Sequence, residues 1–103
     1  MKPSGRFKKR YVLFSLLLGG KPASSADAKR IIHEHFLSFF GELGTSSIAF
    51  KLVLYGEKGG KGILRCERGR VEEAIFCMAL LSDWEGKACR LEPLSTSGSI
   101  KRV

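Results

Sequence analysis

The stretch YVLFSLLLGG, residues 11–20, decides the fold of this chain. Its first eight residues form a short apolar run, which a pair of glycines, Gly19 and Gly20, brings to an end. A run of this length and character is typical of a central β-strand with both faces covered or nearly so. The sequence therefore predicts a strand over residues 11–18.

Two helices are predicted downstream of this strand. Ser24 is suited to cap the first helix, and Gly44 is the kind of residue at which such a helix ends. Its apolar stripe at helical spacing comprises Ala28, Ile32, Phe36, Phe39 and Leu43. The second helix is predicted over residues 71–82, because two glutamates favour its first turn. Its core stripe comprises Val71, Ala74, Ile75, Met78 and Leu81.

Three more strands complete the pattern. Residues 48–55 predict a strand that places Ile48, Phe50, Leu52 and Leu54 on one face. A loop rich in glycine and lysine, residues 56–62, turns the chain into a returning strand over residues 63–67. The last strand is predicted over residues 87–91, with Pro93 ending it.

The order β-α-β-β-α-β predicts an α+β fold, a two-layer α/β sandwich of the ferredoxin-like or RRM-like type. Its four-stranded antiparallel sheet carries both helices on one face, which leaves the opposite face free to bind a partner. We expect one domain over residues 1–103, with a basic arm at residues 1–9 and a basic, serine-rich segment at residues 94–103.

The charge of the chain predicts a polyanionic partner. Eighteen Lys and Arg residues face ten Asp and Glu residues, which gives a net charge of +8. A hydrophobic content of 44% excludes a fully disordered chain. No apolar run approaches the roughly 20 residues that cross a bilayer, so a transmembrane helix is excluded. The polyanionic partner is expected to be either nucleic acid or an anionic membrane surface.

The cysteines indicate a reduced compartment. Cys66, Cys77 and Cys89 are odd in number and too widely spaced for a zinc knuckle, so we expect buried thiols in a cytoplasmic protein. One alternative is a secretory signal, since basic residues 1–10 and the apolar run precede an A-x-A site at residues 26–28. The apolar run is near the short limit for a signal, and Lys21-Pro22 interrupts the approach to that site.

Little in the sequence indicates catalysis. His33 and His35 diverge by about 200° on a helix, so they cannot chelate one metal together. Gly60-Lys61 lacks the remaining residues of a phosphate-binding loop, and the glutamates at residues 42, 72 and 73 are explained by helix ends. We therefore expect a non-catalytic chain that binds no metal or cofactor.

The positive charge is concentrated at the ends of the chain and around the predicted hairpin. The RNA-binding residues are predicted to be Arg6, Lys8, Lys9, Arg10, Lys58, Lys61, Arg65, Arg68, Lys101 and Arg102. Residues 61–66 contain no aromatic side chain, so base stacking is not expected on that strand and phosphate contacts are. Phe76 and Leu80 lie off the core stripe of the second helix, which predicts a protein interface there.

An ordered series of segments resembles the archaeal ribonuclease P protein component 2 family, shared with eukaryotic RNase P and MRP counterparts. The segments are residues 10–11, 40–44, 62–66, 71–80, Gly86 and residues 97–100. The resemblance covers residues 6–103. Relatives often carry a further basic tail or helix after this point, so any contact made by such an extension is uncertain for this sequence.

The resemblance implies an RRM-like subunit of the endoribonuclease that removes 5′ leaders from precursor tRNA, in which the RNA holds the catalytic Mg²⁺ ions. Its implied partners are the RNase P RNA, precursor tRNA, the TIM-barrel-like protein component 3 and other RNase P proteins, with a homodimer or heterotetramer among the possible assemblies. The alternative from the residues alone is a ferredoxin-like regulatory or oligomerising domain that binds a small ligand or a protein.

Overall fold

The computed structural model describes residues 9–98, and its elements follow the predicted order with two short additions. The long elements are β1 (Lys9–Leu18), α1 (Ser25–Ile48), β3 (Lys51–Gly56), β4 (Lys61–Glu67), α2 (Val71–Ala79) and β6 (Lys87–Ser97). The additions are two-residue strands, β2 (Lys21–Pro22) and β5 (Asp83–Trp84), which pair with β1 and β6. A 3₁₀ turn (Arg68–Arg70) leads into α2.

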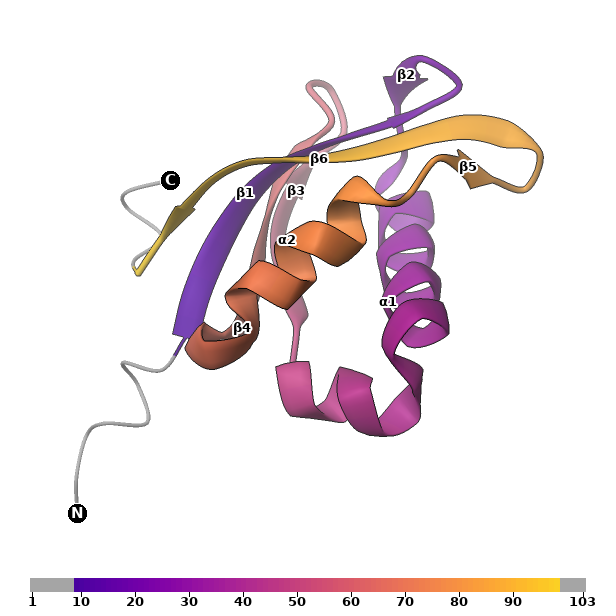
Figure 1. Cartoon of the computed structure of the whole chain (residues 1–103). Helices are drawn as coiled ribbons and strands as arrows, with labels where there is room; N and C mark the ends of the chain where they lie inside the picture. Colours follow the sequence, from indigo (N-terminus) through magenta and orange to yellow (C-terminus); the bar gives the residue numbers. More distant parts are fainter. Residues whose placement is uncertain (1–8, 99–103) are drawn as a thin grey trace.

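The sheet is antiparallel throughout, in the order β3-β4-β1-β6-β5, with β2 paired to the end of β1. Both helices cover the same face of the sheet (Figure 1). The order of the four long strands is that of the ferredoxin-like fold, so the predicted sandwich is confirmed. The two extra strands form short hairpins with the end of β1 and with the start of β6.

The run that decided the fold is the central strand. In β1, Val12, Phe14 and Leu16 are fully buried under the helices. Gly62 on β4 permits this packing, because a Cβ there would lie 2.6 Å from the Leu54 carbonyl oxygen and 2.7 Å from the Phe14 ring. The remaining core comes mainly from α1 and α2, with the three cysteines among its buried residues.

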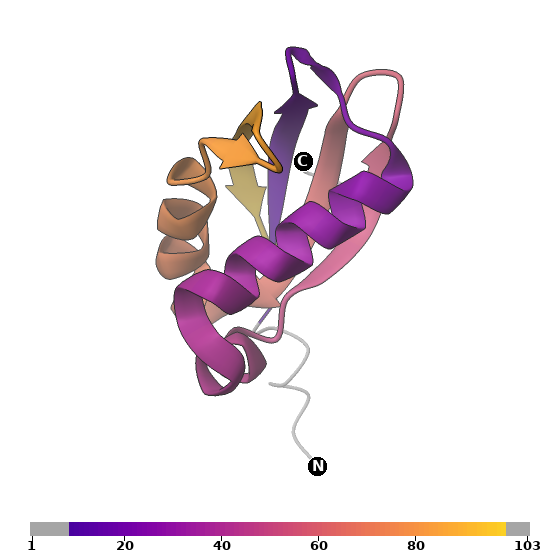
Figure 2. The ribbon, with the colours of Figure 1, turned by 90° about the vertical axis from the view of Figure 1, so that its right-hand side faces the viewer.

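The first helix does not end at Gly44 as predicted. It breaks instead at Gly41, whose φ of 75° and ψ of 177° are accessible to glycine, and a second helical segment continues to Ile48 (Figure 2). Because the break turns the axis, Leu43 is 89% exposed rather than part of the core. Phe39, also predicted to be buried, is 42% exposed. Ile48, predicted to begin a strand, ends α1 and is fully buried.

Two bulges account for the other differences from the predicted strands. In β3, the register shifts between Leu52 and Leu54, so Leu54 leaves the core face and is 55% exposed. In β6, a shift opposite Leu13 and Phe14 accommodates Pro93, and the strand continues to Ser97. Pro93 is tolerated because β5 pairs only with the start of β6, which leaves this part of the strand at the edge of the sheet.

The second helix is shorter than predicted, ending at Ala79, and it buries Ala74, Cys77 and Met78. Cys77 therefore belongs to the core face, which the predicted stripe did not include. No helix in the described part of the chain is long and apolar enough to cross a membrane.

Candidate nucleic-acid interface

The sheet face opposite the helices is built by the alternation of β1 and β4. Since Val12, Phe14 and Leu16 point to the core, Tyr11 and Leu13 lie on the other face, and both are half-buried. On β4, Leu64 and Cys66 point to the core, which places Ile63 and Arg65 on the same outer face. We call this surface the open sheet face.

Two rows of side chains cross the open sheet face. The strand register pairs Arg65 with both Tyr11 and Lys51, and Tyr11 with Ser97. Residues that are paired in this way on one face have Cβ atoms about 5 Å apart. The next row pairs Leu13 with Ile63 and Ser95, and Ile63 with Leu54. A polar, aromatic and cationic row therefore lies beside an apolar one.

Positive charge exceeds negative charge on the open sheet face. Its carboxylates in the described strands belong to Glu67, which lies 2.5 Å from the Lys9 ammonium, and Glu92, which lies 3.9 Å from the Arg90 guanidinium. On this face, the described strands also carry Lys51, Lys61 and Arg65, for which no ion pair with a carboxylate is found within residues 9–98. The Nε atom of Arg65 is buried and has no hydrogen-bond partner. A face of this charge attracts a polyanion.

The predicted RNA-binding residues form two groups rather than one. Lys9, Arg10, Arg65 and Arg68 lie at one end of the sheet, because Lys9 and Arg10 pair with the last residues of β4. Lys58 and Lys61 lie at the opposite end of β4, in and beside the hairpin loop (Figure 1). At about 3.3 Å per residue, some 13 Å of strand separates Lys61 from Arg65. Arg6, Lys8, Lys101 and Arg102 lie outside the described residues.

Sequence reasoning missed two residues on this face, Tyr11 and Lys51. Residues 61–66 contain no aromatic side chain, whereas the alternation of side chains along β1 separates Tyr11 from Val12 and Phe14. Lys51 could not be found in the same way, because its place beside Arg65 depends on the register of β3. Arg70, which also lies near this end, is engaged by Glu73 and by the Ser47 hydroxyl.

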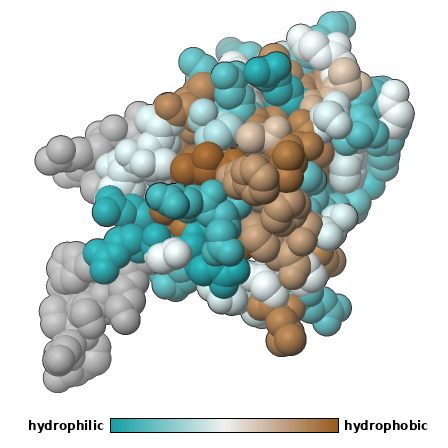
Figure 3. All heavy atoms as spheres, viewed as in Figure 1, coloured by the Kyte–Doolittle hydropathy of each residue, from teal (hydrophilic) through white to brown (hydrophobic). Residues whose placement is uncertain are grey.

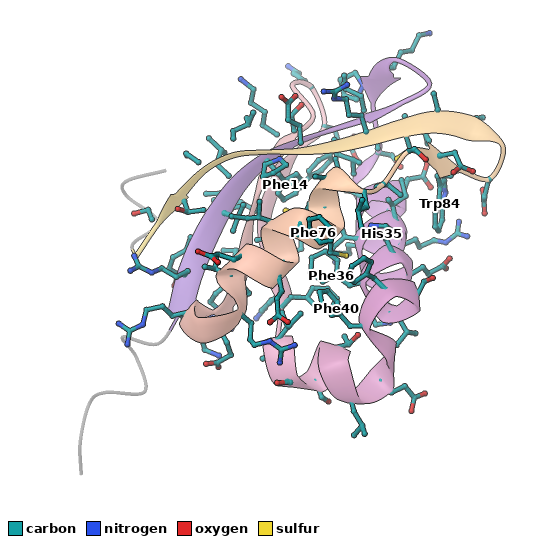
Figure 4. All side chains as sticks on the ribbon, in the orientation of Figure 1. Phe14, His35, Phe36, Phe40, Phe76 and Trp84 are labelled. Carbon is teal, nitrogen blue, oxygen red and sulfur yellow. The ribbon has the colours of Figure 1, made fainter. Side chains whose placement is uncertain are left out.

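A second surface lies on the helices. Phe76 on α2 is 60% exposed, and Leu80, the residue that follows the end of α2, is 49% exposed. The centre of the Phe76 ring lies 6.2 Å from that of Phe39 on α1. We call these three residues the helical patch. Figure 3 shows the apolar surface in this region, and Figure 4 shows Phe76 on α2 together with His35, Phe36 and Phe40 on α1.

The nucleophilic and metal-ligating side chains serve the fold. Burial raises the pKa of Cys66 and Cys89 to about 11 and that of Cys77 to about 12, so these thiols are protonated at neutral pH. His35 is bound through Nε2 to the Cys77 carbonyl oxygen at 2.7 Å, while His33 is exposed. Within residues 9–98, no three His, Cys, Asp or Glu side chains gather where they could hold a metal ion.

Comparisons with known proteins agree with one another. The sequence model of the Rpp14/Pop5 family matches residues 10–103. The chain is 34% identical over 103 residues to ribonuclease P protein component 2 of Pyrococcus furiosus, covering 100% of this chain and 85% of that protein. It is 34% identical over 101 residues to the protein of the same name in Methanosarcina mazei, covering 98% and 84%. A chain in the cryo-EM structure of yeast ribonuclease MRP has the same fold, with a TM-score of 0.70 over 90% of this chain and 76% of that one, at 9% identity.

Proposed function

The chain belongs to the Rpp14/Pop5 family, and we propose that it is a protein subunit of ribonuclease P, which supports the catalytic RNA in removing 5′ leaders from precursor tRNA. The observation that carries this proposal is the identity of about one residue in three, over the full chain, to archaeal proteins named ribonuclease P protein component 2. The ferredoxin-like fold and the cationic open sheet face are consistent with an RNA-binding subunit.

In the proposed mechanism this chain binds and positions RNA and does not break bonds. Lys51, Lys61 and Arg65 neutralise phosphates, which lets a strongly charged RNA fold compactly and hold its Mg²⁺ ions close to the substrate. The described side chains do not fit a metal site of their own, so no step is assigned to a metal bound by this chain. The chemistry belongs to the RNA and its ions, and the protein contributes charge and shape.

We propose that the helical patch binds protein component 3, because the apolar side chains of Phe76 and Leu80 are exposed there. These side chains are apolar, whereas the open sheet face is cationic, so the two surfaces suit different partners. With the patch on the helix side, one subunit can contact protein and RNA at the same time. A homodimer through the patch is the competing assembly, and heterotetramers combine both contacts.

Co-purification tests the proposal. The chain, expressed with an affinity tag in its native cells, is expected to bring down one structured RNA, the other ribonuclease P proteins and precursor tRNA. Sequencing of the bound RNA identifies it independently of any assumption about the site. If the purified chain carries no RNA and binds none at moderate salt, the ferredoxin-like regulatory domain becomes the better account.

A further inference from the structure

The row that contains Tyr11 combines the side chains that bind an unpaired nucleotide. Tyr11 is a half-buried aromatic residue on the central strand, flanked across the strands by Arg65 on one side and Ser97 on the other. Lys51 follows Arg65 at the edge. An aromatic ring accepts a base by stacking, and cations beside it contact the adjoining phosphates.

Within residues 9–98, the Tyr11 side chain takes part in no hydrogen bond and no ring contact. Tyr55, by comparison, donates a hydrogen bond from its hydroxyl to the Ala23 carbonyl at 2.6 Å and stacks on Phe14, and so closes the core. Tyr11 lies on the face that α1 and α2 leave uncovered, outside the buried cluster. Within the described residues, its ring is therefore placed at a surface rather than in a core.

The second row offers an apolar surface for the neighbouring sugar or base. Leu13, Ile63, Leu54 and Lys61 are among the residues that line a shallow hollow of about 360 Å³, in which Ile63 itself is buried. Leu54 reaches this face because of the bulge in β3, and it is 55% exposed. A hollow lined by apolar side chains and one exposed lysine can accept both the apolar face and the phosphate of a nucleotide.

The charge of the face selects the partner. The carboxylates of Glu67 and Glu92 are each held by a cation of the same face, whereas Lys51, Lys61 and Arg65 have no such partner among the recorded ion pairs. An anionic partner with flat, exposed rings satisfies both the charge and the aromatic row. Paired RNA presents charge but hides its bases, so the partner is single-stranded.

We propose that the open sheet face binds an unpaired segment of RNA, with one base stacked on Tyr11 and the adjoining phosphates on Arg65 and Lys51. This site rests on the proposed function and makes it more specific, since it names single-stranded RNA as the bound class. It also adds a base contact where the strand at residues 61–66 alone allowed only phosphate contacts.

The test compares two probes of equal charge and length. One is an oligouridylate of about ten nucleotides, and the other is an abasic oligomer with the same ribose-phosphate backbone. The full chain is expected to bind the oligouridylate more tightly, because stacking on one aromatic side chain is worth roughly 5- to 150-fold in affinity. A purely ionic face binds both oligomers equally, and that result would overturn the proposal.

Substitutions test whether the difference in affinity between the two oligomers comes from Tyr11. Tyr11→Leu keeps an apolar side chain without a ring and is expected to abolish the preference for bases, whereas Tyr11→Phe retains it. Lys51→Gln changes an exposed side chain, so it should weaken both probes alike and flatten the salt dependence of binding by about 0.7. Leu43→Ala, which truncates a side chain that is 89% exposed beyond the Gly41 break, serves as the control.

Each remaining outcome has a defined meaning. If a folded Tyr11→Leu variant still prefers the oligouridylate, the proposal is wrong. The proposal is also wrong if this variant sediments differently from the wild type while its RNA affinity is unchanged, because the face would then be a protein contact. Co-purification tests the proposed function independently of this site. A chain that purifies with its RNA but binds both oligomers equally retains that function and lacks the stacking site.

Discussion

Replacing Phe76 and Leu80 together with alanine is expected to weaken a protein complex more than it weakens the fold. The two side chains are 60% and 49% exposed, and full burial of such a residue stabilises by about 1.5–3 kcal/mol. A partner that covers their exposed parts therefore gains about 2–3 kcal/mol, and the double variant loses affinity roughly 30- to 140-fold. The parts already buried cost the fold about 2 kcal/mol, or roughly 10 °C in melting temperature, which leaves a typical domain folded.

The assay is a calorimetric titration of purified protein component 3 into the wild type, the double variant and Leu43→Ala, with a thermal melt of each. Leu43 lies past the break in α1 and outside the helical patch, so its truncation should change neither the affinity nor the melt. A double variant that is simply unfolded would assign both residues to the core. A folded double variant that binds normally would show that the patch is not the interface, and loss of a homodimer alone would assign it to a second copy.

Three further predictions concern the fold, the thiols and the basic arm. Gly62→Ala should lower the free energy of unfolding by about 1–3 kcal/mol in a denaturant titration, because the new methyl group lies 2.6 Å from the Leu54 carbonyl oxygen; an unchanged midpoint would contradict this. The three buried cysteines, with pKa values of about 11 to 12, should resist a thiol reagent at pH 8 until the protein unfolds, whereas rapid labelling of the native protein would refute their burial. Replacing Lys8 and Lys9 with Gln should weaken RNA binding and flatten the slope of log K against log salt by about one to two. The lower value applies if Lys9 of the wild type stays paired with Glu67 when RNA is bound; an unchanged slope in a folded variant would limit these lysines to solubility.

The order of elements was predictable because it depends on local patterns. The apolar run at residues 11–18, the Ser24 cap and the hairpin glycines each determine structure within a few residues, and the structure confirms the sandwich they predict. The capping hydroxyl of Ser24 accepts a hydrogen bond from the Asp27 amide, as its position in the sequence indicated.

The errors occurred where the structure depends on pairing between distant segments. Whether Gly41 or Gly44 leaves the helical conformation depends on how the following segment packs, and the pattern of α1 is equally compatible with either. Pro93 ends a central strand but is tolerated at an edge with a bulge, and the sequence does not reveal that β6 is unpaired on that side.

The site could be predicted by residue type but not by arrangement. The abundance of Lys and Arg indicated a polyanion, but the division of the basic residues between two ends of β4 follows from the register of the sheet. Tyr11 was identifiable from the alternation of β1 alone, whereas its neighbours Arg65 and Lys51 required the pairing of three strands.

Reconstituted cleavage of precursor tRNA tests the central claim most directly. Cognate RNase P RNA, Mg²⁺ and protein component 3 are combined with and without this chain, and the rate of 5′-leader removal is measured. The chain is expected to raise the rate when the RNA is present and to cleave nothing on its own. A rate of leader removal that is the same with and without the chain would contradict this claim. Cleavage by nuclease-free protein alone would also contradict it, if a point substitution in this chain abolishes that cleavage.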